Sequence, residues 1–136
     1  MNVTIHHLNH KKIEDREFRL TITCDGNIGQ MMIAMIEGKY DAVAEVNVDR
    51  HSSSALSIDD ALEVAYSLTQ NMESKWIHNE GVSASFDVLA AKGARSSSVG
   101  DIFEIDGKFY AVAGCGFEEL TRANARREAE AARAAV

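Results

Sequence analysis

The chain has 136 residues, of which 46% are hydrophobic and 26% charged, which is the size and composition of one globular domain. Its formal net charge of -7 opposes sequence-independent binding to nucleic-acid phosphates, so any such binding would need a local basic patch. No apolar run approaches the roughly 18 residues needed to span a bilayer, and the first residues have no apolar core of a secretory signal, so we expect a soluble, cytoplasmic protein.

Two short stretches near the start of the chain predict a pair of strands. Residues 3–5 and 18–23 are rich in β-branched side chains and alternate between polar and apolar positions. The polar residues 9–16 between them predict a loop. We therefore expect an N-terminal hairpin with a long connection.

Residues 28–37 are predicted to form a helix. Asn27 and Gln30 have the spacing of a capping box, and Gly38 stands where a glycine lets the chain leave a helix. The apolar residues at helical spacing are Ile28, Met31, Met32, Met35 and Ile36. This methionine-rich stripe is typical of a core face or of an adaptable binding face, and its spacing favours the core.

The next segment predicts a strand and then a second helix. Residues 40–48 alternate in polarity, and the polar residues 49–54 predict a loop. The predicted buried face of the strand holds Ala42, Ala44, Val46 and Val48. Ser57 is the predicted N-cap of a helix over residues 58–71, in which acidic residues of the first turn complement the helix dipole.

Trp76, the only tryptophan, lies in a polar connector over residues 72–81. A lone tryptophan in such a stretch either anchors the connector onto the core or faces a partner, and we favour the anchor. Residues 82–89 alternate again and predict a strand, and the small residues 90–98 predict a loop.

Asp106 and Gly107 separate two alternating runs and predict a β-hairpin. A type I′ turn needs positive φ, which Asp tolerates and Gly permits. The two strands lie over residues 102–105 and 109–113, and a helix or an edge element follows at Phe117–Leu120.

The composition changes after Leu120. Residues 121–136 carry four Arg and two Glu, a charge of +2, which leaves -9 on residues 1–120. We therefore predict one α+β domain over residues 1–120 and a helical tail over residues 121–136. Because its apolar face holds mainly alanines, the tail either frays in solvent or docks on a neighbour, and we favour fraying.

Together these elements predict an α+β fold. Its antiparallel or mixed sheet has about five or six strands, packed on one face by the helices at 28–37 and 58–71, with a peripheral C-terminal helix.

One pattern in the second half of the chain is shared with known proteins. It consists of Arg95-Ser96-Ser97-Ser98-Val99-Gly100-Asp101, then Asp106-Gly107-Lys108, Tyr110-Ala111-Val112 and Gly116-Phe117-Glu118-Glu119-Leu120. The pattern resembles small phage- and plasmid-encoded proteins, some of them grouped as YodL-like, and the resemblance covers residues 40–120. It implies an accessory or host-interaction role in a mobile element, without a catalytic residue to carry over.

The histidines and cysteines predict no metal centre and no nucleophile. His6 and His7 point to opposite faces of an extended strand, and His10 adds no recognised ligand spacing. Cys24 and Cys115 are too few and too far apart for a disulfide framework, and we expect reduced, mostly buried thiols. Cys115 lies between two glycines like a nucleophile in a tight turn, but only the start of the last helix is near enough in sequence to activate it.

The serine-rich run over residues 95–100 has two interpretations. Its hydroxyls, backbone amides and Arg95 guanidinium fit an anion cup, but the spacing of a nucleotide-binding phosphate loop is missing. We favour the alternative, in which this run is a turn that shapes the entry into the following strand.

The functional prediction is a non-enzymatic accessory protein that binds a host protein in the host cell cytoplasm and uses no metal or cofactor. The predicted partner-binding residues are Trp76, Arg95, Phe109, Tyr110 and Phe117. We also expect a homo-oligomer, most simply a dimer, with the hairpin or the tail at the contact.

The alternative prediction is a protein that binds single-stranded nucleic acid. Sheet aromatics would stack on bases, and the tail would contact phosphates. The residues predicted for this role are Phe103, Arg122, Arg126 and Arg127, with Phe109 and Tyr110 as further stacking residues.

Overall fold

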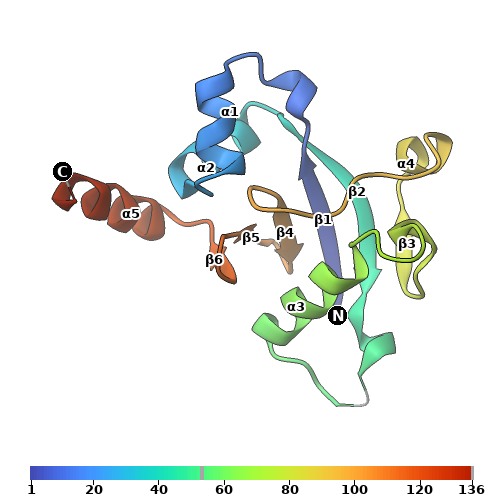
Figure 1. The fold of residues 1–136 in the computed structure, drawn as a ribbon. Helices are drawn as coiled ribbons and strands as arrows, with labels where there is room; N and C mark the ends of the chain where they lie inside the picture. Colours follow the sequence, from blue (N-terminus) through green and yellow to red (C-terminus); the bar gives the residue numbers. More distant parts are fainter. Residues whose placement is uncertain (53, 136) are drawn as a thin grey trace.

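The computed structural model describes residues 1–52 and 54–135, so Ser53 of the predicted loop and Val136 of the predicted tail lie outside the described residues. One antiparallel sheet of six strands runs through this part of the chain in the order β3-β2-β1-β4-β5-β6 (Figure 1). The strands are β1 (Asn2–Leu8), β2 (Tyr40–Asn47), β3 (Val82–Ala84), β4 (Ile102–Ile105), β5 (Lys108–Val112) and β6 (Phe117–Glu119). The helices are α1 (Arg16–Thr23), α2 (Ile28–Ile36), α3 (Ile58–Leu68), α4 (Phe86–Ala90) and α5 (Arg122–Ala134). The predicted α+β class is confirmed.

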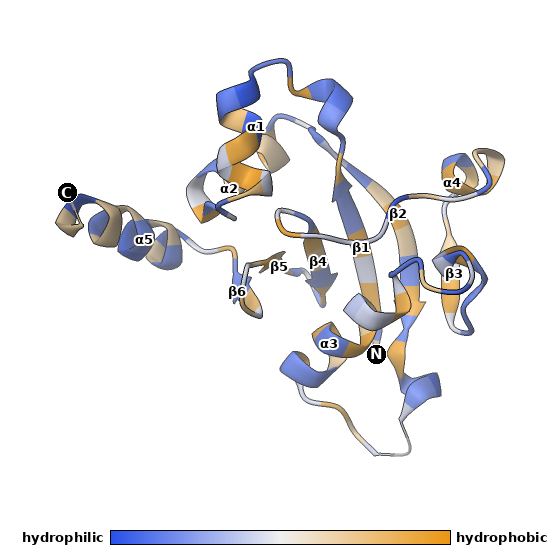
Figure 2. Ribbon diagram, in the orientation of Figure 1, coloured by the Kyte–Doolittle hydropathy of each residue, from blue (hydrophilic) through white to orange (hydrophobic). Residues whose placement is uncertain are grey.

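Helices cover both faces of the sheet. Neighbouring residues of one strand belong to different hydrophobic clusters, as with Ile102 and Phe103 in β4. The α2 cluster consists of Leu8, Ile13, Ile22, Ile28, Met31, Ala34, Ile102 and Ala111. The α3 cluster includes Val3, Ile5, Val46, Leu62, Trp76, Phe103, Ile105 and Val112. Figure 2 shows hydrophobic residues on α1 and α2 and, separately, on α3. The prediction that the helices at 28–37 and 58–71 pack on one face is therefore wrong. Strands such as β4 have apolar side chains on both faces of the sheet, so each face needs a covering helix.

The segment predicted as a second strand, residues 18–23, is instead part of helix α1. The carboxylate of Asp15 accepts a hydrogen bond from the backbone N–H of Phe18 and so caps the helix. Phe18 and Ile22 are one helical turn apart and both pack into the α2 cluster. No N-terminal hairpin forms, and β1 pairs with β2 and β4.

A β-bulge changes the predicted face of β2. Ile5 pairs with Ala44 and His6 with Ala42, so Val43 is an extra residue between them. Because the bulge shifts the alternation by one residue, Val43 and Ala44 are both buried and Ala42 is exposed. The prediction that Ala42 belongs to the buried face is therefore wrong.

The stretch predicted as one strand over residues 82–89 divides in two. Only Val82–Ala84 pairs with β2, as an edge strand. The Ser85 hydroxyl then accepts a hydrogen bond from the backbone N–H of Val88 and caps the short helix α4. This leaves Phe86 83% exposed instead of on a strand face.

The predicted hairpin and the predicted helix caps are confirmed. Asp106 and Gly107 have φ of 50° and 77° and join β4 to β5 as a two-residue turn. Asn27 accepts a hydrogen bond from the N–H of Gln30, and Ser57 accepts one from the N–H of Asp60. Residues 117–119 form the edge strand β6, which was one of the two alternatives for this segment.

Helix α5 docks on the rest of the protein along one side. The Glu128 carboxylate accepts a hydrogen bond of 2.8 Å from the backbone N–H of Ile28, at the start of α2. Ala125 packs against the α2 cluster, although α5 buries no residue completely. Docking therefore replaces the preferred prediction of a fraying tail. Within the described residues, no helix combines the length and apolarity needed to cross a membrane.

Candidate functional site

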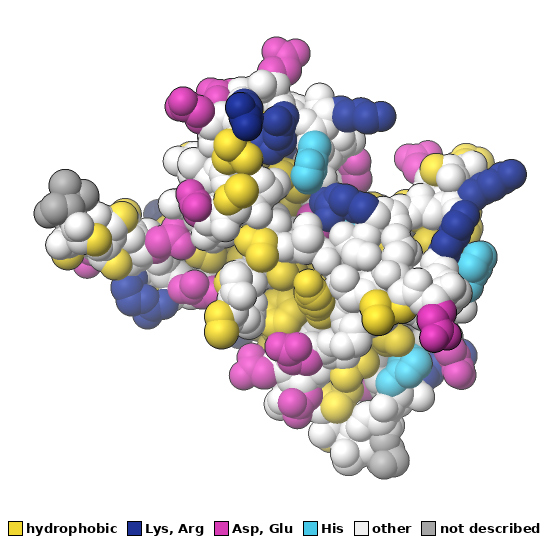
Figure 3. All heavy atoms as spheres, in the orientation of Figure 1, with side chains coloured by type: hydrophobic (Ala, Val, Ile, Leu, Met, Phe, Trp, Pro, Cys, Tyr) yellow, Lys and Arg dark blue, Asp and Glu magenta, His cyan; other side chains and the backbone are white. Residues whose placement is uncertain are grey.

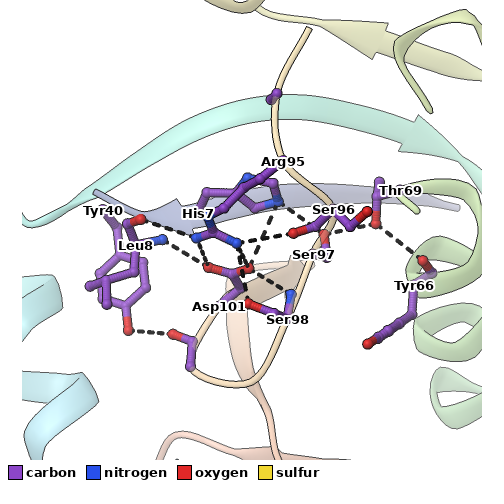
Figure 4. Close-up of polar contacts among 12 residues, drawn as sticks. His7, Leu8, Tyr40, Tyr66, Thr69, Arg95, Ser96, Ser97, Ser98 and Asp101 are labelled. Carbon is purple, nitrogen blue, oxygen red and sulfur yellow. Dashed lines mark hydrogen bonds and ion pairs between the residues drawn. The ribbon is translucent and has the colours of Figure 1, made fainter. Parts of the chain in front are cut away.

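The loop between α4 and β4 is held by an ion pair whose carboxylate is buried and whose guanidinium is partly exposed (Figure 4). Arg95 Nη1 lies 2.7 Å from Asp101 Oδ2, and Arg95 Nη2 lies 2.7 Å from Asp101 Oδ1. The backbone N–H groups of Leu8 and Ser98 also donate to the Asp101 carboxylate, which is 1% exposed. Arg95 is therefore neutralised within the protein, which argues against the anion cup and agrees with the turn interpretation.

A chain of hydrogen bonds starts at the same loop and ends on α3. His7 Nε2 lies 3.0 Å from Ser97 Oγ, which lies 2.8 Å from Thr69 Oγ1. The Thr69 hydroxyl donates to the Ala65 carbonyl oxygen, 2.9 Å away. Each hydroxyl has one proton, and that of Thr69 is donated to Ala65. Ser97 therefore donates a hydrogen bond to Thr69 and accepts one from the Nε2–H group of His7.

The direction of these hydrogen bonds decides whether Ser97, His7 and Asp101 form a catalytic triad. In a triad the serine donates to one ring nitrogen of the histidine and the carboxylate accepts from the other. Here both groups approach His7 Nε2, with Asp101 Oδ2 at 3.9 Å and Ser97 Oγ at 3.0 Å. Burial lowers the pKa of His7 to about 4, so the ring is neutral at pH 7. The arrangement positions the loop and does not activate Ser97.

Trp76 is part of the same support and is fully buried. Its indole N–H donates to the carbonyl oxygens of Ala94 and Arg95, and its ring packs edge-on against His7 with centroids 6.0 Å apart. The anchor interpretation is confirmed. The prediction that Trp76 contacts a partner is wrong, because no part of its side chain reaches the surface.

The other predicted partner-binding residues do not form one surface. Arg95 is engaged with Asp101, and Phe109 packs against the α2 cluster on one side of the sheet. Tyr110 and Phe117 pack against the α3 cluster on the opposite side. The prediction that Phe103 stacks on bases is also wrong, because Phe103 is fully buried in the α3 cluster.

Phe117 lies beside a groove that we call the Phe117 groove. Its volume is about 290 Å³, and it lies between α3 and the glycine-rich turn that joins β5 to β6. Tyr66 and Phe117 form an edge-to-face pair with ring centroids 6.2 Å apart. The lining residues are Glu63, Tyr66, Val99, Val112, Ala113, Gly114, Gly116 and Phe117.

The arginines of α5 separate into a stripe and a single residue. Arg122, Arg126 and Arg133 are exposed, and their spacing places them within about 40° of one another around the helix. We call them the arginine stripe. Arg127 points elsewhere and lies 3.3 Å from the Glu118 carboxylate. Of the predicted nucleic-acid residues, Arg122 and Arg126 thus share a face and Arg127 does not.

The two cysteines are exposed in the structure, so the expectation of buried thiols is wrong. Cys24 caps the end of α1, and Cys115 lies in the turn between β5 and β6. No group of three or more His, Cys, Asp or Glu residues within 1–52 and 54–135 has the geometry to hold a metal ion.

Comparison with known proteins found no counterpart: no family model, no characterised protein and no solved structure matches this chain. The resemblance to YodL-like proteins therefore stays a prediction.

Proposed function

We propose that the protein is a non-enzymatic accessory protein that binds a host protein. The observation that carries the proposal is the uncovered apolar face of α2. Ile33 is 43% exposed and Ile36 is 81% exposed, and around the helix Ile36 lies between Ile33 and the partly buried Met32.

The composition of α2 makes this face unusual. The helix reads IGQMMIAMI and has no charged residue, whereas a surface helix usually presents charged and polar residues to water. A helix that is apolar all round is typical of a buried position, yet here only the side with Ile28, Met31 and Ala34 is buried. A second protein surface would cover the remaining side.

The same composition indicates the chemistry of the partner. An uncharged isoleucine and methionine face complements an apolar surface, and methionine side chains adapt to partners of different shape. The patch is small, which suits a weak or transient complex. The resemblance to phage- and plasmid-encoded proteins supports a host protein of the cytoplasm as the partner.

The hydrogen bonds around Ser97 support the non-enzymatic part of the proposal. The most enzyme-like combination in the chain, Ser97 with His7 and Asp101, uses its hydrogen bonds to hold the loop. Ser97 is 2% exposed, so a substrate has no access to its hydroxyl.

Binding of single-stranded nucleic acid is the second candidate. The arginine stripe favours it, because exposed arginines on one helix face release counterions from phosphates. The burial of Phe103 and a net charge of -7 weigh against it.

The test compares the Ile33→Lys/Ile36→Lys double variant with Met72→Lys. Met72 is 83% exposed and lies outside α2, so it controls for the removal of an exposed hydrophobic residue. Each tagged chain is incubated with host lysate, the retained protein is purified, and its affinity for each chain is measured by calorimetry. Circular dichroism confirms that the variants fold.

We expect the wild type and Met72→Lys to bind the same protein, and the double variant to bind it at least about tenfold more weakly. Equal affinity for the double variant would show that α2 is not the binding face. A wild-type chain that retains no discrete protein would contradict the proposed function.

A further inference from the structure

We infer that the arginine stripe of α5 binds the Phe117 groove of a second copy of this chain. The inference concerns surfaces other than the exposed face of α2, so it does not rest on the proposed function.

The first observation is that the stripe lies at the surface of its own chain. Arg122, Arg126 and Arg133 are exposed, and their side of α5 lies about 110° around the helix from the side with Ala125 and Glu128, which contact the rest of the protein. Their charges span 11 residues, or about 16 Å along the helix. Figure 1 shows α5 extending away from the sheet, where another molecule can reach it.

The second observation is that the Phe117 groove has the chemistry to bind a guanidinium group. Tyr66 and Phe117 provide aromatic surface, and Glu63 provides a carboxylate at the same groove. An arginine stacks on aromatic faces and donates to a carboxylate at the same time. The glycine-rich turn leaves the opposite side of the groove open. Gly114 and Gly116 have no side chain, and no atom lies within 4 Å of a Cβ position there.

The surroundings of the groove are acidic. The charges of Glu119, Asp59 and Asp106 act on Tyr110, whose pKa is raised first by burial and then by these carboxylates. Figure 3 shows acidic side chains gathered over α3, next to a hydrophobic area in the middle of the molecule. This field attracts a cationic partner and repels nucleic acid.

The α5 helix of a chain cannot reach the Phe117 groove of the same chain. Helix α5 is tied to the start of α2 by Glu128 and packs against the α2 cluster, whereas the Phe117 groove includes residues of α3 on the opposite face of the sheet. A second copy meets both requirements, because each chain combines a body of charge -9 with a tail of charge +2. In a two-fold dimer each tail occupies the groove of the other copy.

The experiment is a reciprocal charge exchange. One variant is Arg122→Glu/Arg126→Glu/Arg133→Glu, and the other is Asp59→Lys/Glu63→Lys. Light scattering measures the mass of each chain at tens of micromolar, in low and in high salt. The charge-matched control, Lys11→Glu/Arg16→Glu/Lys92→Glu, reverses exposed cations away from α5.

We expect the wild type and the control to be dimers in low salt and to shift towards monomers in high salt, because screening weakens exposed ion pairs. Each exchanged variant alone should dimerise at least about tenfold more weakly, since its tail and groove carry the same sign. An equimolar mixture of the two should restore the dimer, because both contacts are then complementary.

Three outcomes would overturn the inference. The wild type is a monomer in both salts, or the triple arginine variant stays a dimer, or the mixture fails to reassociate although both variants fold. Titration with single-stranded DNA separates the competing explanation: binding that the triple variant loses, together with a monomeric wild type, assigns the stripe to nucleic acid.

Discussion

Arg95 and Asp101 close the loop between α4 and β4 on itself, with both nitrogen–oxygen distances at 2.7 Å. The same carboxylate receives the backbone N–H of Leu8, and the guanidinium donates to the Leu8 carbonyl oxygen. Both groups of this pair therefore hold the end of β1, 87 and 93 residues earlier in the chain.

Asp101→Asn should destabilise the protein strongly. The substitution removes the negative charge that compensates Arg95. It also replaces one carboxylate oxygen, which accepts two N–H hydrogen bonds, by an NH2 group that cannot accept them. Removing one partner of a buried ion pair typically costs about 3–5 kcal/mol, and the 36% exposure of the Arg95 side chain places the expected loss at the lower end. Chemical denaturation measures the loss, and Asp106→Asn in the exposed hairpin turn is the control. Similar stabilities of the two variants would contradict the assigned role of Asp101.

Gly100→Ala should also destabilise the protein, for steric reasons. Gly100 has φ of +94°, and a Cβ there would lie 2.8 Å from Ile22 Cγ2 and 2.9 Å from the Ile22 carbonyl oxygen. Gly107→Ala is the matched control, because its φ is +77° and a Cβ would have nothing within 4 Å. We expect a loss of about 1 kcal/mol for the control, from backbone strain, and about 3 kcal/mol for Gly100→Ala. Equal thermal shifts would show that α1 does not pack closely on this loop.

Stability should fall as the pH is lowered from about 6.5 to about 4 because of His7. Its pKa is 6.5 in an exposed state and about 4 when buried, so between these values the unfolded chain binds a proton that the folded chain does not. The stabilising contribution is complete above pH 6.5 and is lost progressively towards pH 4. The loss is on the order of 3 kcal/mol.

His7→Gln removes this titration, and His78→Gln, at an exposed position, is the control. Denaturant unfolding at several pH values should show a weaker pH dependence for His7→Gln and an unchanged one for His78→Gln. A pH dependence that is identical in all three proteins would assign the effect to other groups.

Glu128→Ala should release α5 from α2. The variant loses the acceptor for the Ile28 N–H, which is one of the free donors at the start of α2. Amide hydrogen exchange of residues 122–134 should accelerate, while the sheet amides keep their protection. Glu130→Ala, on an exposed position of the same helix, should leave the exchange rates unchanged. Unaltered exchange in Glu128→Ala would mean that alanine contacts alone hold the tail.

Local patterns predicted the elements that local interactions decide. The turn at Asp106 and Gly107 depends on the φ preferences of two adjacent residues, and the caps at Asn27 and Ser57 depend on a spacing of three residues. These features follow from the sequence because their partners are close in the chain. Residues 18–23 show the limit, since β-branched alternation there predicts a strand while Asp15 and tertiary packing select a helix.

The hydrogen-bonded residues His7, Ser97 and Thr69 could not be predicted as a group, because their contacts join distant parts of the chain. Ser97 lies 90 residues from His7 and 28 from Thr69, and no spacing rule links such positions. Only the pair of Arg95 and Asp101 had a local indication, because these opposite charges lie six residues apart in the predicted loop. The burial of Trp76 and Phe103 depends on which face α3 covers, which periodicity does not specify.

The central position of β1 has a consequence for folding during synthesis. The ribosome makes β1 before its partner β4, which begins about 100 residues after the start of β1, at Ile102. Until β4 has left the ribosome, one edge of β1 lacks its hydrogen-bond partner, and Asp101 cannot yet bind Leu8. The nascent chain therefore carries an open edge of β1 while about 100 further residues are synthesised.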